Sequence, residues 1–416
     1  MKRITIVLTL IFCFGSIWSN PIDTITAKRV AANFYRQNNV IGVKNGQTLR
    51  LQRQAPEYVV APIDTVYTGF YVLNSINGDG FVIVSSDNNV MPVLGYSNDK
   101  SFDANNIPPA LRDWLLGYEM EIRRARMDET LVAEEARRAW GALLAGQDLP
   151  NRSTRSVSPL LTTTWSQEWP YNMACPNDAS ASGILNGHVY TGCVATAMAQ
   201  VMKYWEHPQV GVGSHTYTHS NYGTLSQNFE TAIAWNEMLD TYSPTGTYTV
   251  LQASAISSLM YMCGVSVEMN YDVQGSGAQV INGGYSFIPS AETALKTYFD
   301  YSSNLHGIAK SKYQNGQWVD NYSNSQWINT LKNELDSGRV ILYRGANNNN
   351  TAAHAFVCDG YDNNNYFHFN WGWGGNADNY FTISSLTPSS HNYSYGQQAV
   401  IGIHQRTSLS ILIMIW

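Results

Sequence analysis

The chain has 416 residues, of which 44% are hydrophobic and only 13% are charged, and its formal net charge is −6. The hydrophobic share excludes wholesale disorder, and the length suggests two or three domains. The acidic balance argues against nucleic acid as a partner and against basic helices on a membrane surface, since both need clustered Lys and Arg. The charged share is about half the usual ~25%, which is more typical of an extracellular protein than of a cytosolic one.

The first residues have the layout of a secretory signal peptide. Two basic residues, Lys2 and Arg3, precede a mostly apolar run over 4–14, and small residues follow before residue 20. This pattern predicts a signal peptide over 1–19 and a secreted, extracellular protein. The alternative is a buried N-terminal strand, which has no need of a basic flank. The run is shorter than the about 20 residues of a spanning helix, so we expect no integral membrane span.

Residues 20–150 are predicted to form a small α+β unit. They carry 13 Lys/Arg and 15 Asp/Glu, against 10 and 16 in the longer stretch 151–416, so the charge density halves near residue 150. The apolar spacing predicts a helix over 25–37, strands over 70–73, 80–85 and 91–96, and mostly helix over 109–146. The charged run 119–138 is expected to be a solvated helical face. The polar stretch 146–156, with Arg152 and Arg155, is expected to be an exposed linker open to cleavage.

Residues 151–404 form a second, larger predicted domain, whose clearest element is a helix that begins at Cys193. Apolar residues at 194, 197, 198, 201, 202 and 205 give this helix an unbroken buried stripe. We expect Thr191 and Gly192 to cap it. A thiol in the first turn lies at the positive end of the helix dipole, which lowers its pKa and favours the thiolate. The alternative is a small buried core cysteine, which is also the interpretation of Cys175, Cys263 and Cys358.

Further along this domain, helices are predicted near 252–262, 291–299 and 325–336, followed by a run of strands from 339 to 403. Two segments among these strands supply groups that a cysteine nucleophile needs. His354 stands at the entrance of a strand, where its imidazole can take the proton of the Cys193 thiol. Asn370 follows sixteen residues later, so a hairpin is expected to bring its side-chain oxygen to the other ring nitrogen of His354, with Trp371 shielding that hydrogen bond. The alternatives are a structural histidine and a glycine-rich turn with core tryptophans.

These motifs together resemble the streptopain family of papain-like cysteine peptidases. The resemblance is carried by Gln167 and by the segments Gly192–Ala197, His354–Val357 and Asn370–Gly375, while Gly80–Ser85 and Leu94–Ser97 resemble the inhibitory prosegment of that family. It implies an α+β fold: a papain-like catalytic domain over 151–404, with a helical side, an antiparallel β side and a cleft between them, preceded by a small α+β inhibitory prosegment over 20–150. It also implies that Cys193 is the nucleophile, His354 the base and Gln167 an oxyanion donor, and that Asn370 and Trp371 orient His354.

On this interpretation the chain is a secreted cysteine endopeptidase made as an inactive zymogen. Its partners are protein or peptide substrates and its own prosegment, which acts as an intramolecular inhibitor. We expect no cofactor and no metal, because the chain has no CxxC pair and because His215 and His219 fall on a predicted strand, where residues four apart are distant. Two alternatives stay open: a papain-fold amidase or transferase acting on cell-wall peptides, and a non-catalytic binding module on the same scaffold. Residues 405–416 form an apolar tail to which the sequence assigns no role.

Overall fold

The computed structural model describes eleven stretches of the chain, namely residues 21–38, 40–44, 47–50, 56–127, 134–150, 153–243, 246–282, 289–314, 317–346, 353–383 and 396–406. The predicted signal peptide, Arg152 and all but the first two residues of the predicted apolar tail lie outside these residues. No helix within them combines the length and the apolar character needed to cross a membrane.

Seven α-helices occur in the described residues, and each falls in a region where the apolar spacing predicts one. They are α1 (Thr24–Asn38), α2 (Pro109–Met127), α3 (Glu134–Leu144), α4 (Cys193–Trp205), α5 (Val250–Ser266), α6 (Ala291–Thr297) and α7 (Asn324–Asp336). Two short 3₁₀ turns occur at η2 (Gly183–Leu185) and η3 (Trp235–Glu237). Side-chain caps fix the starts of α5 and α7, where Thr249 and Ser323 each form a capping box with a glutamine three residues later.

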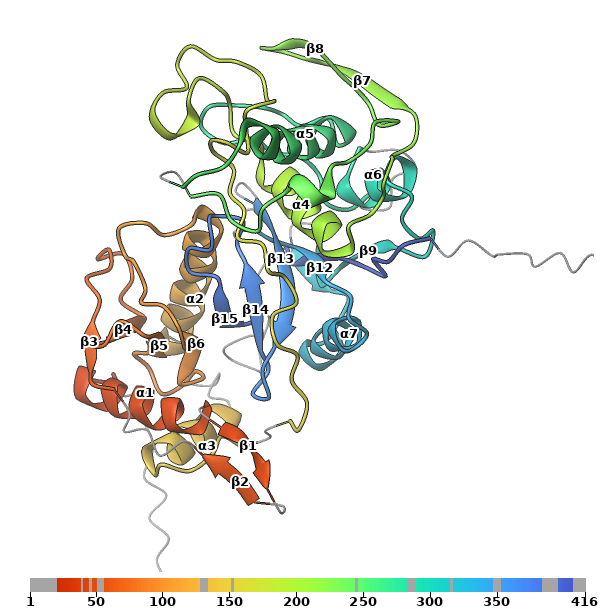
Figure 1. The fold of residues 1–416 in the computed structure, drawn as a ribbon. Helices are drawn as coiled ribbons and strands as arrows, with labels where there is room; N and C mark the ends of the chain where they lie inside the picture. Colours follow the sequence, from red (N-terminus) through yellow and green to blue (C-terminus); the bar gives the residue numbers. More distant parts are fainter. Residues whose placement is uncertain are drawn as a thin grey trace, which may run out of the picture.

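Ten strands form one antiparallel sheet that runs through both predicted domains (Figure 1). Their spatial order is β3 (Tyr58–Val60), β4 (Phe70–Ser75), β5 (Phe81–Ser85), β6 (Val93–Ser97), β15 (Asn379–Thr382), β14 (Tyr366–Asn370), β13 (Ala353–Tyr361), β12 (Ile341–Ala346), β16 (Gln398–Ile401) and β9 (His306–Ala309). Three separate hairpins complete the strands: β1 (Val40–Lys44) with β2 (Gln47–Arg50), β7 (Ser214–His219) with β8 (Gly223–Asn228), and β10 (Ser311–Gln314) with β11 (Gln317–Asp320).

The strands of the predicted prosegment and of the predicted catalytic domain meet at the pair β6–β15. Tyr96 lies opposite Tyr380 and Gly95 lies opposite Phe381. The approach is close at Gly95, because a Cβ there would come within 2.7 Å of the Phe381 ring. The fall in charge density near residue 150 therefore marks a boundary along the chain but not a gap in the sheet.

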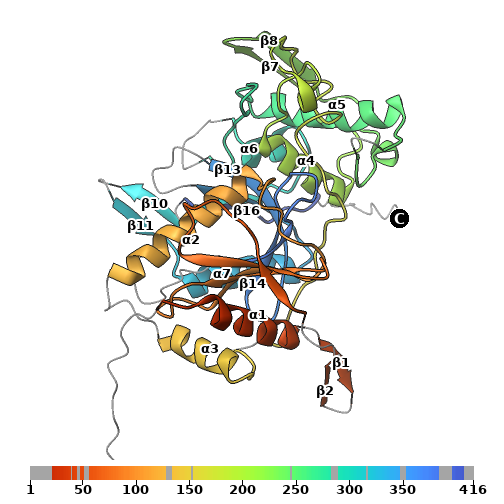
Figure 2. The same ribbon diagram turned by 90° about the vertical axis from the view of Figure 1, so that its left-hand side faces the viewer.

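Helices cover both faces of this sheet, and the two faces have different helices. In the prosegment half, α1 and α3 pack on one face and α2 on the other (Figure 2). The core beneath α2 continues without a break into the predicted catalytic domain, where it includes α7 and residues of β12 to β15. On the opposite face these strands pack against α4, and α5 and α6 pack on α4 in the same core. The start of β13 therefore lies where α4, which begins with Cys193, and α2, which belongs to the predicted prosegment, come together.

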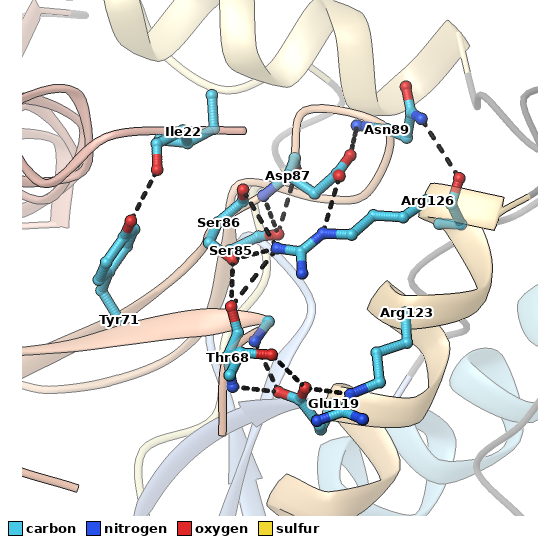
Figure 3. A network of polar contacts seen from close by, with 12 residues as sticks. Ile22, Thr68, Tyr71, Ser85, Ser86, Asp87, Asn89, Glu119, Arg123 and Arg126 are labelled. Carbon is cyan, nitrogen blue, oxygen red and sulfur yellow. Dashed lines mark hydrogen bonds and ion pairs between the residues drawn. The ribbon is translucent and has the colours of Figure 1, made fainter. Parts of the chain in front are cut away.

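The expectation that residues 119–138 form a solvated helical face is wrong for two of the acids on α2. Glu119 and Glu121 are 3% and 2% exposed. The Glu119 carboxylate accepts hydrogen bonds from the backbone N–H groups of Thr68 and Gly69, at 2.8 and 2.6 Å, and from the Thr68 hydroxyl at 2.9 Å (Figure 3). A buried carboxylate is tolerated when donors surround it in this way.

A second set of contacts fixes the end of α2. Arg126 forms an ion pair with the buried Asp87, with 3.1 Å between Nε and Oδ2, and also donates to the Ser86 hydroxyl (Figure 3). Arg123 pairs with Glu119 on the outer side of the helix. The second half of α2 is thus bound to the loops of the prosegment sheet, and its first half projects over the peptidase.

Candidate active site

The backbone before α4 places Cys193 at the start of the helix. Gly192 is the N-cap residue, with φ of 91°, and a Cβ at this position would overlap the Met269 sulfur at 2.5 Å, so glycine is needed here. The expected cap by Thr191 is not formed, since the Thr191 hydroxyl bonds to the Thr196 hydroxyl at 2.9 Å. No side chain therefore caps the N–H groups of the first turn, and the positive end of the helix dipole faces the Cys193 thiol.

Cys193 and His354 form a pair in the structure, as the sequence predicts. Burial opposes ionisation of the Cys193 thiol, but the hydrogen bond from His354 and its positive charge outweigh burial, so the pKa of the thiol is lowered. The backbone N–H of Ala355 also points at the sulfur, with 3.4 Å between N and Sγ. The pair has the electrostatics of a thiolate beside an imidazolium.

The three other described cysteines differ from Cys193. Cys175, Cys263 and Cys358 are free, fully buried thiols. Burial raises the pKa of Cys175 to about 12 and raises the pKa values of Cys263 and Cys358 as well. Among the described cysteines, only Cys193 has a lowered pKa.

A cleft of about 370 Å³ opens beside the pair. Its lining includes Gln167, Tyr190, Trp373 and the glycine-flanked segment 274–277. Tyr190 and Trp373 stack with ring centroids 6.3 Å apart, and Ser276 ties its segment to the cleft wall by donating to the Tyr190 carbonyl at 2.7 Å. The cleft therefore has aromatic walls, a glycine-rich rim and the carboxamide residue Gln167 next to the nucleophile.

Asn370 does not lie beside His354. It pairs across the hairpin with Val357, three residues further along β13, and it is 3% exposed. Its side-chain oxygen accepts from Gln200 at 2.9 Å and from the Gly372 N–H at 3.0 Å, and its amide nitrogen donates to the Thr163 carbonyl at 2.7 Å. A pairing of Asn370 with His354 needs a hairpin centred on residue 362. The turn that joins the strands lies at 362–365, so Asn370 lies nearer the turn than His354 and does not reach it.

Trp371 lies where a shield for His354 is expected. It is 2% exposed and lines the same small cavity as His354, Cys193 and Gln167. Its indole N–H donates to the Ala377 carbonyl at 2.9 Å, and its ring packs against Phe356, with centroids 4.6 Å apart. Trp371 thus supplies an apolar wall behind the catalytic pair.

An acid of the predicted prosegment also contacts this pair, and no sequence pattern singles it out. Asp113 of α2 contacts His354, with 3.2 Å between Oδ2 and Nε2. Burial opposes protonation of His354, but its hydrogen bonds with Asp113 and Cys193 and the charges of these groups outweigh burial and raise the pKa of His354 to about 9. Pro108 and Pro109, at the start of the same helix, line the cavity over Cys193. No local pattern distinguishes Asp113, because its partner lies far away in the chain.

No group of three or more His, Cys, Asp and Glu side chains in the described stretches is arranged to hold a metal ion. His215 and His219 have separate partners, since His215 lies 3.0 Å from Glu268 and His219 lies 3.2 Å from the Asn270 side chain.

Comparison with known proteins finds two families along the chain. A family model described as the peptidase C10 family matches residues 165–381, and one described as Spi protease inhibitor matches residues 19–122. Streptopain of Streptococcus pyogenes is 30% identical, with 95% of this chain and 97% of streptopain covered. The thiol protease/hemagglutinin PrtT of Porphyromonas gingivalis is also 30% identical, over 97% of this chain, but the chain spans only 44% of that relative.

A solved structure agrees with these sequence matches. A fragment of Prevotella intermedia prointerpain A with a cysteine-to-alanine substitution is 29% identical and superposes with a TM-score of 0.64. The match covers 84% of this chain and all of that fragment. The similarity therefore extends over most of the chain and includes residues of both predicted domains.

Proposed function

Since the chain belongs to the peptidase C10 family and is a cysteine peptidase with an inhibitor-type prosegment, we propose that Cys193 and His354 hydrolyse peptide bonds within protein substrates bound in the cleft beside them. The observation that carries this proposal is the Cys193–His354 pair, in which the thiol pKa is lowered and the imidazole pKa is raised. The pair opens onto the cleft beside Gln167, and no other described cysteine has a lowered pKa.

The reaction is acyl transfer. The Cys193 thiolate attacks the carbonyl carbon, and the electron pair of the C=O bond moves onto the oxygen. The Gln167 amide and the Cys193 backbone N–H donate hydrogen bonds to this oxyanion. When the oxyanion collapses, the C–N bond breaks and His354 gives its proton to the leaving amine. Water then attacks the thioester while His354 takes a proton from it, which releases the acid and restores the thiolate.

Two contacts of the prosegment inhibit this reaction in the precursor. Pro108 and Pro109 line the small cavity that Cys193 and His354 also border, so the start of α2 restricts the approach of a substrate carbonyl to the thiol. Asp113 holds the Nε2 atom of His354 by an ion pair. Substrate can therefore bind productively only after α2 has left the cleft.

Maturation by a cut in the linker fits the contacts on both sides of it. On the prosegment side, the Gln37 side chain bonds to the backbone of 147 and 149. On the peptidase side, Ser153 donates to the Asn363 carbonyl, and Val157 bridges to Tyr361. A cut between 149 and 157, such as at Arg152, separates the two units without removing a strand from either. We also propose that the chain is exported, on the evidence of the signal-peptide pattern over 1–19.

The test is hydrolysis of unfolded casein by the activated protein, with and without a thiol alkylator. Cys193→Ala should lose hydrolysis and leave the precursor uncut, while Cys175→Ala, which removes another buried thiol, should keep both. Retained hydrolysis in Cys193→Ala would reject the proposed nucleophile. Binding of casein without any cleavage by the wild type would favour a binding module instead.

A further inference from the structure

Behind the cleft, a closed network of carboxamides connects α4 to the segments on either side of the active site. Gln200 lies seven residues after Cys193 on α4 and is completely buried. Its side-chain oxygen accepts from the Thr163 hydroxyl at 2.9 Å and from the Trp165 N–H at 3.2 Å. These two donors fix the orientation of the carboxamide, so its NH₂ group faces Asn370 and donates to the Asn370 oxygen at 2.9 Å.

Asn370 closes the network. Its NH₂ group donates to the Thr163 carbonyl at 2.7 Å, and its oxygen also accepts from the Gly372 N–H. The backbone continues the connection, since the Trp165 carbonyl accepts from Gly374 at 3.2 Å and the Gln167 carbonyl accepts from Thr191 at 3.2 Å. The segment 163–167 is thereby held between the helix of the nucleophile and the turn that bears Trp371 and Trp373.

We propose that Gln200 is a positioning residue of the peptidase reaction: with Asn370 it holds segment 163–167, and hence the Gln167 carboxamide, at the place where the oxyanion forms. This inference rests on the proposed role of Gln167. Gln200 has no contact with the reacting atoms, so it acts through the geometry of the donor. Displacements of about 0.5 Å matter at such a site. A buried network in which each side-chain nitrogen and oxygen has a hydrogen-bond partner is a rigid way to prevent them.

The same geometry predicts which step Gln200 serves. The network bonds to the segment of the oxyanion donor and to the turn after β14, and none of its hydrogen bonds reaches His354. Loss of Gln200 should therefore reduce stabilisation of the oxyanion and leave the thiolate unchanged. Alkylation by iodoacetamide separates the two, since it needs the thiolate but forms no oxyanion.

The first experiment uses Gln200→Glu, which keeps the shape and the accepting oxygen and replaces the NH₂ donor with an oxygen that faces Asn370. Each precursor is processed with immobilised wild-type enzyme, which is then removed, and active sites are counted by iodoacetamide incorporation. We expect kcat for peptide hydrolysis to fall about 10- to 100-fold while the alkylation rate stays within about twofold. Ser266→Ala, which removes a buried hydrogen bond on α5, should change neither. Equal losses of kcat and alkylation would overturn the proposal.

The pH dependence supplies a second measurement. The carboxyl group introduced by Gln200→Glu can again donate to Asn370 once it is protonated, so the ratio of kcat for this variant to that of the wild type should rise as the pH is lowered from 8 towards 5. A ratio that does not change with pH would contradict the proposed hydrogen bond.

A double-mutant cycle tests whether Gln200 acts through Gln167. Gln167→Ala should lower kcat by about 10²–10³-fold, as the loss of one oxyanion donor does. Adding Gln200→Glu to Gln167→Ala should lower kcat by no more than about a further twofold. Losses that multiply would overturn the inference. If Gln167→Ala alone has no effect, the proposed oxyanion donor is wrong and the role of Gln200 is rejected with it; if only Gln200→Glu has no effect, the proposed function stands and this inference falls.

Discussion

In the precursor, the imidazole of His354 contacts both Cys193 and Asp113, and these two contacts have opposite effects on catalysis. Its contact with the Cys193 sulfur is the one that catalysis uses, and its contact with Asp113 is the one that prosegment removal breaks. Both partners raise the pKa of His354, so the precursor holds the histidine in its protonated form. We therefore infer that the prosegment inhibits by engaging the same charge that the active enzyme needs for the leaving amine.

The Asp113 contact can be tested on its own. Asp113→Asn keeps the shape of the side chain but removes its charge, so α2 should leave the cleft more readily. A hydrogen bond to a charged group contributes about 1.5–3 kcal/mol, and the 26% and 22% exposure of the two side chains puts this one at the lower end. We expect the precursor to convert about tenfold faster, measured by gel. Glu135→Gln removes an exposed acid on α3 and should have no effect; equal rates in all three chains would show that Asp113 does not contribute to latency.

The lowered pKa of Cys193 predicts the pH profile of its alkylation. Because the hydrogen bond and charge of His354 outweigh burial and lower this pKa, the thiolate should react with iodoacetamide below the pKa of ~8.5 of a free thiol. In His354→Ala only burial and backbone donors remain among the main influences, so the reactivity step should move up towards or above pH ~8.5. The rate is followed by mass on precursor that is still intact, in which Cys193 is partly exposed. If the alkylation step of the wild type lies at the pKa of a free thiol, and His354→Ala does not shift it, the ion pair is absent.

At the scale of elements, the β6–β15 pair is the contact by which the prosegment strands extend the peptidase sheet. Gly95→Val would bring a side chain against the Phe381 ring and the Tyr380 carbonyl, which lie 2.7 and 3.0 Å from a Cβ at this position. The two strands should separate, and the precursor should convert at least several-fold faster, as measured by gel. Gly117→Ala adds a methyl group to α2 where nothing lies within 4 Å, so it serves as the control. If Gly95→Val converts as slowly as Gly117→Ala, the sheet junction does not hold the prosegment.

The sequence predicts well those helices and strands whose residues interact with near neighbours along the chain. The 3.6-residue stripe after Cys193 predicts α4 correctly, because every apolar residue in it packs on one core. The hairpin of β13 and β14 is also predicted, but its register is not, since it depends on where the turn falls and on the bulge at 358–360. Asn370 therefore belongs to a buried network instead of contacting His354. Asp113 and Gln200 escape prediction for the same reason: their partners are chosen by tertiary packing.

At the scale of the whole molecule, the prosegment is part of the folded core of the precursor. The Trp114 ring of α2 packs among Phe356, Phe369 and Trp371, with centroids 6.2, 5.4 and 6.3 Å away. The Tyr118 hydroxyl lies 2.8 Å from the Thr382 carbonyl and 3.0 Å from the Leu94 carbonyl, one on each side of the junction, so its proton can bond to either. Removing the prosegment exposes this apolar surface of the peptidase, so the covalent linker contributes little to holding the two parts together.

This arrangement predicts that cutting the linker is not enough for release. In Cys193→Ala precursor with a specific cleavage site in place of 150–153, the cut prosegment should co-elute with the peptidase on gel filtration. It should still do so in about 1 M NaCl, because the contacts are mainly apolar or buried and salt screens only exposed charges. Trp114→Ala removes a ring from the shared core, which costs about 3–5 kcal/mol, and should let the cut prosegment separate. Ile25→Ala changes a side chain that is 78% exposed and should not. Separation of the unsubstituted parts in salt would mean that exposed charges, and not the shared core, hold the zymogen together.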